Sequence, residues 1–103
     1  MSRSCYAFSY TSFDQTKRII ESVLKNNGYK NINENGENVW KNGVGFLTAM
    51  KYIKIEFSEN QQVKIYGWVR PVASSEQDLD GVVGALPKKQ VLKVINTIGN
   101  SIN

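Results

Sequence analysis

Histidine is absent from the sequence, and Cys5 is its one cysteine. These shortages exclude an intramolecular disulfide, a zinc site made of cysteine and histidine, and a mechanism that depends on a histidine base. A catalytic cysteine needs a neighbouring base or a positive environment to form its thiolate. Because no histidine is available for that role, we expect Cys5 to be an inert, buried thiol and the protein to be non-enzymatic.

Long hydrophobic runs are also missing. No stretch approaches the roughly 18 apolar residues of a membrane-spanning helix, and residues 1–10 lack the continuous apolar segment of a signal peptide. Hydrophobic residues make up 41% of the chain and charged residues 21%, as in an ordinary globular domain. We therefore expect a single domain over residues 1–103, in the reducing cytoplasm and without a transmembrane segment.

Acidic residues are too scattered to suggest a metal centre or a paired acid–base catalyst. Asp78 and Asp80 are close in sequence, but a calcium site needs more oxygen ligands at regular spacing. The net charge of +4 gives only mild attraction to polyanions, and dedicated nucleic-acid-binding proteins show denser basic clusters. The sequence thus predicts no metal and no cofactor, and nucleic acid is the less favoured partner.

The spacing of apolar residues predicts two helices and several strands. Ser12 and Gln15 form a capping box at the start of the first helix, and Gly28 supplies its left-handed end. Asn35-Gly36 indicates a tight turn between two short strands. The expected elements are a strand at 5–10, a helix at 13–27, strands at 29–33 and 37–41, a hairpin at 52–70 and a helix at 87–101.

This order predicts an α+β fold that forms a two-layer sandwich. Sequential strands joined by tight turns are antiparallel neighbours, so the order is strand, helix, three or four antiparallel strands, helix. Each helix and the sheet have one apolar face, which places both helices on one face of the sheet. Gly67 lies on the apolar side of its strand, where we expect a close approach of the first helix or a bulge.

The opposite face of the sheet is the first candidate site. By alternation it carries Tyr52, Lys54, Glu56, Lys64, Tyr66, Trp68 and Arg70. Aromatic and cationic residues of this kind suit the centre of a protein interface, and they also stack on bases and neutralise phosphates. A solvated face with ordinary cross-strand pairs remains the plain alternative. Because Trp68 is large and apolar, we expect a partner or the loop at 72–86 to cover it.

The segment before the last helix is the second candidate. Gly84 precedes the helix, and Lys88 and Lys89 fall in its first turn, an arrangement that can bind an anion. The pattern lacks the ending of a phosphate-binding loop, and Pro87 removes one backbone donor. The alternative is a loop that packs its apolar residues on the edge of the core.

A resemblance to a known family rests on three groups of residues: Glu37-Asn38-Val39-Trp40-Lys41-Asn42-Gly43-Val44-Gly45-Phe46-Leu47-Thr48-Ala49, Tyr52-Ile53-Lys54-Ile55-Glu56-Phe57 with Trp68-Val69, and Gly81 with Gly84-Ala85-Leu86-Pro87-Lys88-Lys89. In these the chain resembles a small uncharacterised domain of Gram-positive bacterial proteins. The resemblance implies a bacterial origin and transfers no catalytic residue. The element order is also similar to the TATA-binding-protein-like and helix-grip architectures, which does not imply DNA binding.

The sequence therefore predicts a non-enzymatic interaction or binding module. The favoured partner is a second copy of the chain or another protein, docked on the open sheet face around Tyr66 and Trp68. The alternative is a nucleic acid, small ligand or anion, bound by the same aromatic rings together with Lys54, Lys64 and Arg70.

Overall fold

The computed structural model describes residues 3–43, 49–71, 75–80 and 85–102. Five strands form one open antiparallel sheet in the order β1-β5-β4-β3-β2, accompanied by two helices. The elements are β1 (Ser4–Ser9), α1 (Phe13–Asn26), β2 (Lys30–Glu34), β3 (Glu37–Asn42), β4 (Met50–Ser58), β5 (Gln62–Arg70) and α2 (Ala85–Ile102). The predicted α+β class is confirmed, with four strands between the helices.

Local signals fix the first helix and the first hairpin where the sequence predicts them. The backbone N–H of Gln15 donates to the Ser12 side chain at 3.3 Å, which caps α1. Gly28 has a φ of +83° just after the helix. Asn35 and Gly36, between β2 and β3, both have positive φ, as a type I′ turn requires.

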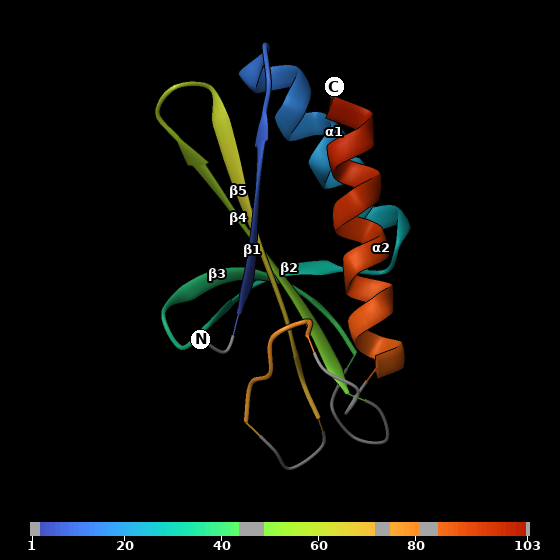
Figure 1. The fold of residues 1–103 in the computed structure, drawn as a ribbon. Coiled ribbons are helices and arrows are strands. Elements are labelled where there is room, and N and C mark those ends of the chain that lie inside the picture. Colours follow the sequence, from blue (N-terminus) through green and yellow to red (C-terminus); the bar gives the residue numbers. More distant parts are fainter. Residues whose placement is uncertain (1–2, 44–48, 72–74, 81–84, 103) are drawn as a thin grey trace.

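Both helices cover the same face of the sheet (Figure 1). Side chains from α1, α2, β4 and β5 meet there in the main core. Its fully buried members include Leu24, Ile53, Val63, Ile65, Val69, Val91, Ile95 and Ile98. The predicted arrangement of two helices on one face is therefore confirmed.

Gly67 permits a close approach, but the approaching helix is not the expected one. A Cβ atom on Gly67 would lie 2.8 Å from Ile95 Cδ1 and 3.0 Å from Val91 Cγ1. Both residues belong to α2, so the expectation that the first helix approaches here is wrong. The reason is the strand order: β5 lies between β1 and β4, which places Gly67 beneath the last helix.

The sheet divides between β3 and β4. These strands pair only through Trp40–Asn42 and Lys51–Ile53, whereas β4 pairs with β5 along its whole length. Beyond these pairs the β2–β3 hairpin turns away and runs across the face that the helices leave free (Figure 1). The hairpin thereby covers part of the face away from the helices, and a groove is left on the face that carries the helices.

Candidate functional site

The sheet face that the sequence predicts to be open is closed over its two largest rings. Tyr52 and Trp68 are each 2% exposed, and they stack with their ring centres 5.2 Å apart. They form a second core with residues of β3 and β4, Val39 and Met50, against which Ile32 of β2 also packs. The sequence predicts that a partner or the loop at 72–86 covers Trp68, and here the β2–β3 hairpin covers both rings.

An ion-pair cap, made of Arg3, Glu37, Lys54 and Glu76, lies over this second core. The Arg3 guanidinium stacks 3.7 Å from the centre of the Trp68 ring. It donates two hydrogen bonds to Glu37, at 2.8 and 2.9 Å, and two to Glu76, at 2.9 and 3.1 Å. Lys54 also donates to Glu37, at 3.0 Å. The cap thus joins β1, the hairpin and the segment 75–80 above Trp68.

A second carboxylate of the hairpin secures Tyr52. The Tyr52 hydroxyl donates to Glu34 at 2.7 Å, and Lys41 donates to the same carboxylate at 3.2 Å. The hydrogen bond from Tyr52, followed by that from Lys41, lowers the pKa of Glu34.

The other residues of the predicted face are not brought together as one exposed surface. Lys54 is held in the ion-pair cap. Arg70 is half-buried and donates to Met50 Sδ at 3.6 Å. Lys64 and Tyr66 are half-buried on β5, towards Cys5 of β1. Cys5 itself is exposed, so the expectation of a buried thiol is wrong: it pairs with Tyr66 near the edge of the sheet that β1 forms.

The described part of the loop at 72–86 is residues 75–80. It pairs with β5 just past the point where the pairing of β1 with β5 ends. Gln77 and Val69 exchange backbone hydrogen bonds of 2.9 and 2.8 Å. The Leu79 N–H donates to Ser4 Oγ at 3.0 Å, and the Leu79 side chain reaches the main core. With Glu76 in the ion-pair cap, this part of the loop contributes to covering Trp68.

Lys88 and Lys89 of the predicted anion site have different surroundings. Gly84 lies outside the described residues. Lys88 is 5% exposed, and its ammonium donates to the Asp80 carbonyl at 2.6 Å, whereas Lys89 is exposed. The Lys88 ammonium therefore holds the preceding loop to α2 and does not stand beside Lys89.

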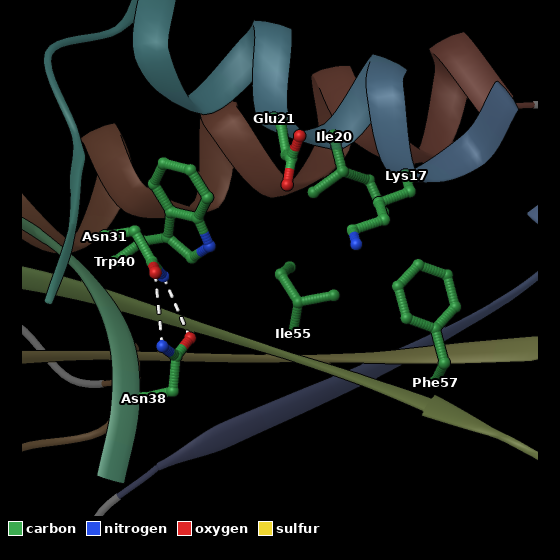
Figure 2. A pocket seen from close by; sticks show the side chains of 8 residues that line it. All are labelled: Lys17, Ile20, Glu21, Asn31, Asn38, Trp40, Ile55 and Phe57. Carbon is green, nitrogen blue, oxygen red and sulfur yellow. Dashed lines mark hydrogen bonds between the residues drawn. The ribbon is translucent and has the colours of Figure 1, made fainter. Parts of the chain in front are cut away.

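A groove between α1 and β4 is the cavity that the divided sheet leaves on the helix side. It encloses about 270 Å³ and opens to solvent. Figure 2 shows the residues of this α1–β4 groove, which are Lys17, Ile20, Glu21, Asn31, Asn38, Trp40, Ile55 and Phe57. No sequence signal marks it, because the pattern predicts Ile55 and Phe57 as core and Lys17 and Glu21 as the wet side of a helix.

The groove combines apolar walls with polar groups. Trp40 and Phe57 stand on either side of Ile55, and the side chains of Lys17 and Glu21 extend from α1 into the space between them (Figure 2). Asn31 and Asn38 close one end, exchanging hydrogen bonds of 2.9 and 3.1 Å across β2 and β3. Within the described ranges, no ion pair joins Lys17 to Glu21, which leaves both charges available to a ligand.

An aromatic cluster continues the groove beyond Phe57. The Phe57 ring packs edge-on against Phe13, 4.7 Å away, and against Tyr10, 5.6 Å away. Phe13 is 46% exposed, one of the large apolar side chains that remain accessible. An occupant longer than the groove would therefore meet a further apolar surface at this end.

Comparison with models of protein families, with curated proteins and with solved structures finds no match. In the part of the chain that the structure describes, no three histidine, cysteine, aspartate or glutamate side chains gather as a metal site would need. No described helix has both the length and the apolar character needed to cross a membrane.

The ion-pair cap predicts a loss of stability in acid. The hydrogen bonds from Arg3, with a smaller contribution from Lys54, lower the pKa of Glu37 to about 2, against roughly 4.3 in an unfolded chain. Since the folded value is the lower one, the stabilisation is complete above about pH 5 and disappears as the pH falls to about 2. Allowing for solvent screening, we expect a loss of about 1–2 kcal/mol from this group.

Urea unfolding between neutral pH and about pH 2.5 measures this loss. Glu37→Gln is the control variant, because it keeps the shape of the side chain and removes the titrating group. Its stability at neutral pH is lower, and its pH dependence over this interval is shallower than that of the wild type. A pH dependence identical in the two proteins would contradict the assignment.

Proposed function

We propose that the protein is a non-enzymatic binding module that takes an extended segment of another polypeptide into the α1–β4 groove. The observation that supports this most is the free edge of β4. Its pairing with β3 ends at Ile53, and among the described residues the strand continues to Ser58 paired only with β5 on its other side. A strand with one unpaired edge presents a row of backbone N–H and C=O groups that can pair with another chain.

The groove beside this edge would make binding selective for particular peptide side chains. In such complexes the backbone hydrogen bonds give affinity, and pockets for alternate side chains give specificity. Alternate residues of an added strand would face α1 and meet Trp40, Ile55 and Phe57. Lys17 and Glu21 would place one charge of each sign beside them. The groove thus favours peptides that alternate large apolar residues with polar ones.

The sheet face expected to bind a partner or nucleic acid gives less support. Its proposed anchors, Tyr52 and Trp68, are buried within the protein itself and leave no ring surface for a partner or a base. The groove, by contrast, leaves part of Ile55 and Phe57 accessible. The module therefore binds through the helix side of the sheet.

Selection of random heptapeptides against the immobilised protein, followed by titration of the enriched peptides, tests this proposal. The chain holds two tryptophans, so its indole N–H groups give an internal comparison by NMR. We expect the indole signal of Trp40, which lines the groove, to shift on peptide addition, and that of Trp68 to stay in place.

Two charge reversals on α1 provide the matched variants. Lys17→Glu places a second carboxylate beside Glu21 in the groove, and we expect peptide affinity to fall about 5-fold or more. Lys25→Glu changes the same charge at an exposed position outside the groove and is expected to alter affinity by less than about 2-fold. Equal effects of both reversals, or a shift of the Trp68 signal alone, would refute the groove as the binding site.

A further inference from the structure

The β1 side of the sheet presents a second unpaired strand edge. β1 stands at the end of the sheet order, and among the described residues it pairs with β5 alone. The segment 75–80 reaches it at one end, where the Leu79 N–H donates to Ser4 Oγ. The described lining of the α1–β4 groove includes no residue of β1, so this edge is a separate surface.

The hydrogen bonds of β5 show which residues of β1 turn their backbone groups outward. Val69 exchanges backbone bonds with Gln77 on the β1 side of β5, since β4 occupies the other side. Bonded residues alternate along an antiparallel ladder, so the β1 residues that bond to β5 are Ser4, Tyr6 and Phe8. The remaining residues therefore direct their N–H and C=O groups to the free edge, and they are Cys5, Ala7 and Ser9.

The β1 edge lacks the charges and prolines that commonly keep sheet edges apart. Residues 4–13 contain no charged residue and no proline. The three residues that face outward have small, exposed side chains, which leave room for another strand. The opposite edge strand, β2, carries Lys30 and Glu34. The two edges of the sheet thus differ, and β1 is the one open to pairing.

The helix beside this edge adds no charge to it. Gly99 of α2 packs directly on Phe8, because a Cβ atom at that glycine would overlap the Phe8 ring. Residues 94–102 of α2 contain no charged residue. Lys64, which lies beside Ala7 on β5, stands opposite Glu56 of β4. Two copies of a chain with net charge +4 can therefore meet at this edge without bringing unneutralised like charges together.

We propose that two copies of the chain pair through their β1 edges, antiparallel and about a two-fold axis at Ala7, to form one continuous sheet. In this register Ala7 faces Ala7 and Cys5 faces Ser9, so every outward backbone group of these residues finds a partner. On the helix side Tyr6 of one copy faces Phe8 of the other, a cross-strand aromatic pair. Both rings are half-buried in the single chain. Because each copy uses its β1 edge and β2 is charged, assembly ends at the dimer.

Sedimentation equilibrium from about 10 µM to about 1 mM protein tests this pairing. Contact between two short strands buries less than the roughly 1,200 Å² of a standard interface, so we expect a dissociation constant of about 10–500 µM. The amides of Cys5, Ala7 and Ser9 are expected to exchange more slowly as concentration rises, whereas those of Tyr6 and Phe8 are protected throughout. A monomer at about 1 mM, species larger than a dimer, or exchange at Ala7 that does not depend on concentration would overturn the proposal.

Two substitutions of Ala7 separate edge pairing from other self-association. Ala7→Pro removes an N–H that β5 does not use, which a proline on an edge strand allows. Ala7→Lys keeps the backbone and places two like charges opposite each other at the axis. Each is expected to weaken the dimer about 10-fold or more.

Asn33→Lys is the matched control, since it adds the same charge at an exposed position of β2. We expect it to change the dissociation constant of the dimer by less than about 2-fold. Ala7→Lys is also expected to leave peptide affinity of the groove within about 2-fold, because pairing and peptide binding use different strands. Wild-type dimerisation in Ala7→Lys, or equal weakening by Asn33→Lys, would show that the β1 edge is not the contact.

Discussion

Replacing Trp68 with alanine is expected to lower the free energy of unfolding by about 3–5 kcal/mol, as for other fully buried large side chains. The ring is 2% exposed and fills the second core between Tyr52 and the β2–β3 hairpin. Its removal leaves a cavity that the stacked Tyr52 ring cannot fill, and it takes away the surface on which Arg3 lies. Urea unfolding monitored by circular dichroism measures the change.

Leu86→Ala is a suitable control for this variant, because Leu86 is 68% exposed and the substitution is expected to cost less than about 0.5 kcal/mol. A Trp68 covered only by a second copy of the chain would give a similarly small effect on the folding of one copy, together with a change in association state. A loss below about 1 kcal/mol for Trp68→Ala would therefore contradict the closed face.

Replacing Arg3 with alanine is expected to cost about 2–3 kcal/mol, the second largest effect. Arg3 makes four hydrogen bonds to Glu37 and Glu76 and stacks on Trp68 at once. Hydrogen bonds between charged partners are stronger than neutral ones, and a partly desolvated cation over an indole ring adds to them. Without Arg3, the carboxylates of Glu37 and Glu76 lose the guanidinium that joins them, while Lys54 still pairs with Glu37.

Arg3→Lys distinguishes the shape of the guanidinium from its charge. A lysine keeps the positive charge but cannot form the forked pairs or stack its plane on the indole, so we expect it to recover less than half of the lost stability. Quenching of tryptophan fluorescence by acrylamide is expected to increase in Arg3→Ala, since Trp68 loses its cover. Arg3→Lys with wild-type stability, or Arg3→Ala within about 0.5 kcal/mol of wild type, would show that the cap does not hold the hairpin.

Local chemistry explains why much of the fold could be predicted. The cap at Ser12, the positive φ at Gly28 and the turn at Asn35-Gly36 depend on neighbouring residues alone. The alternation in β4 and β5 and the apolar stripes of the helices report which faces are buried. These signals together were sufficient for the α+β class and for the side of the sheet that carries the helices.

The candidate site could not be predicted, because it depends on the residue at which β3 and β4 stop pairing. Alternation places Tyr52 and Trp68 on the face away from the helices, which is correct, but it does not show what lies above them. Their cover comes from Arg3 and from the hairpin, which are distant in sequence. The same departure of β3 from β4 creates the groove, and no residue in either strand marks the point where pairing ends.

Amide hydrogen exchange along β4, recorded by NMR with and without a selected peptide, tests the central claim most directly. We expect every second amide from Lys54 to Ser58, those facing away from β5, to exchange rapidly in the free protein and to become protected when the peptide pairs with this edge. The amides of Lys51–Ile53, where β4 is paired with a strand on each side, are expected to be protected throughout. Full protection of Lys54–Ser58 in the free protein, or exchange there that a bound peptide does not slow, would contradict a free β4 edge as the binding site.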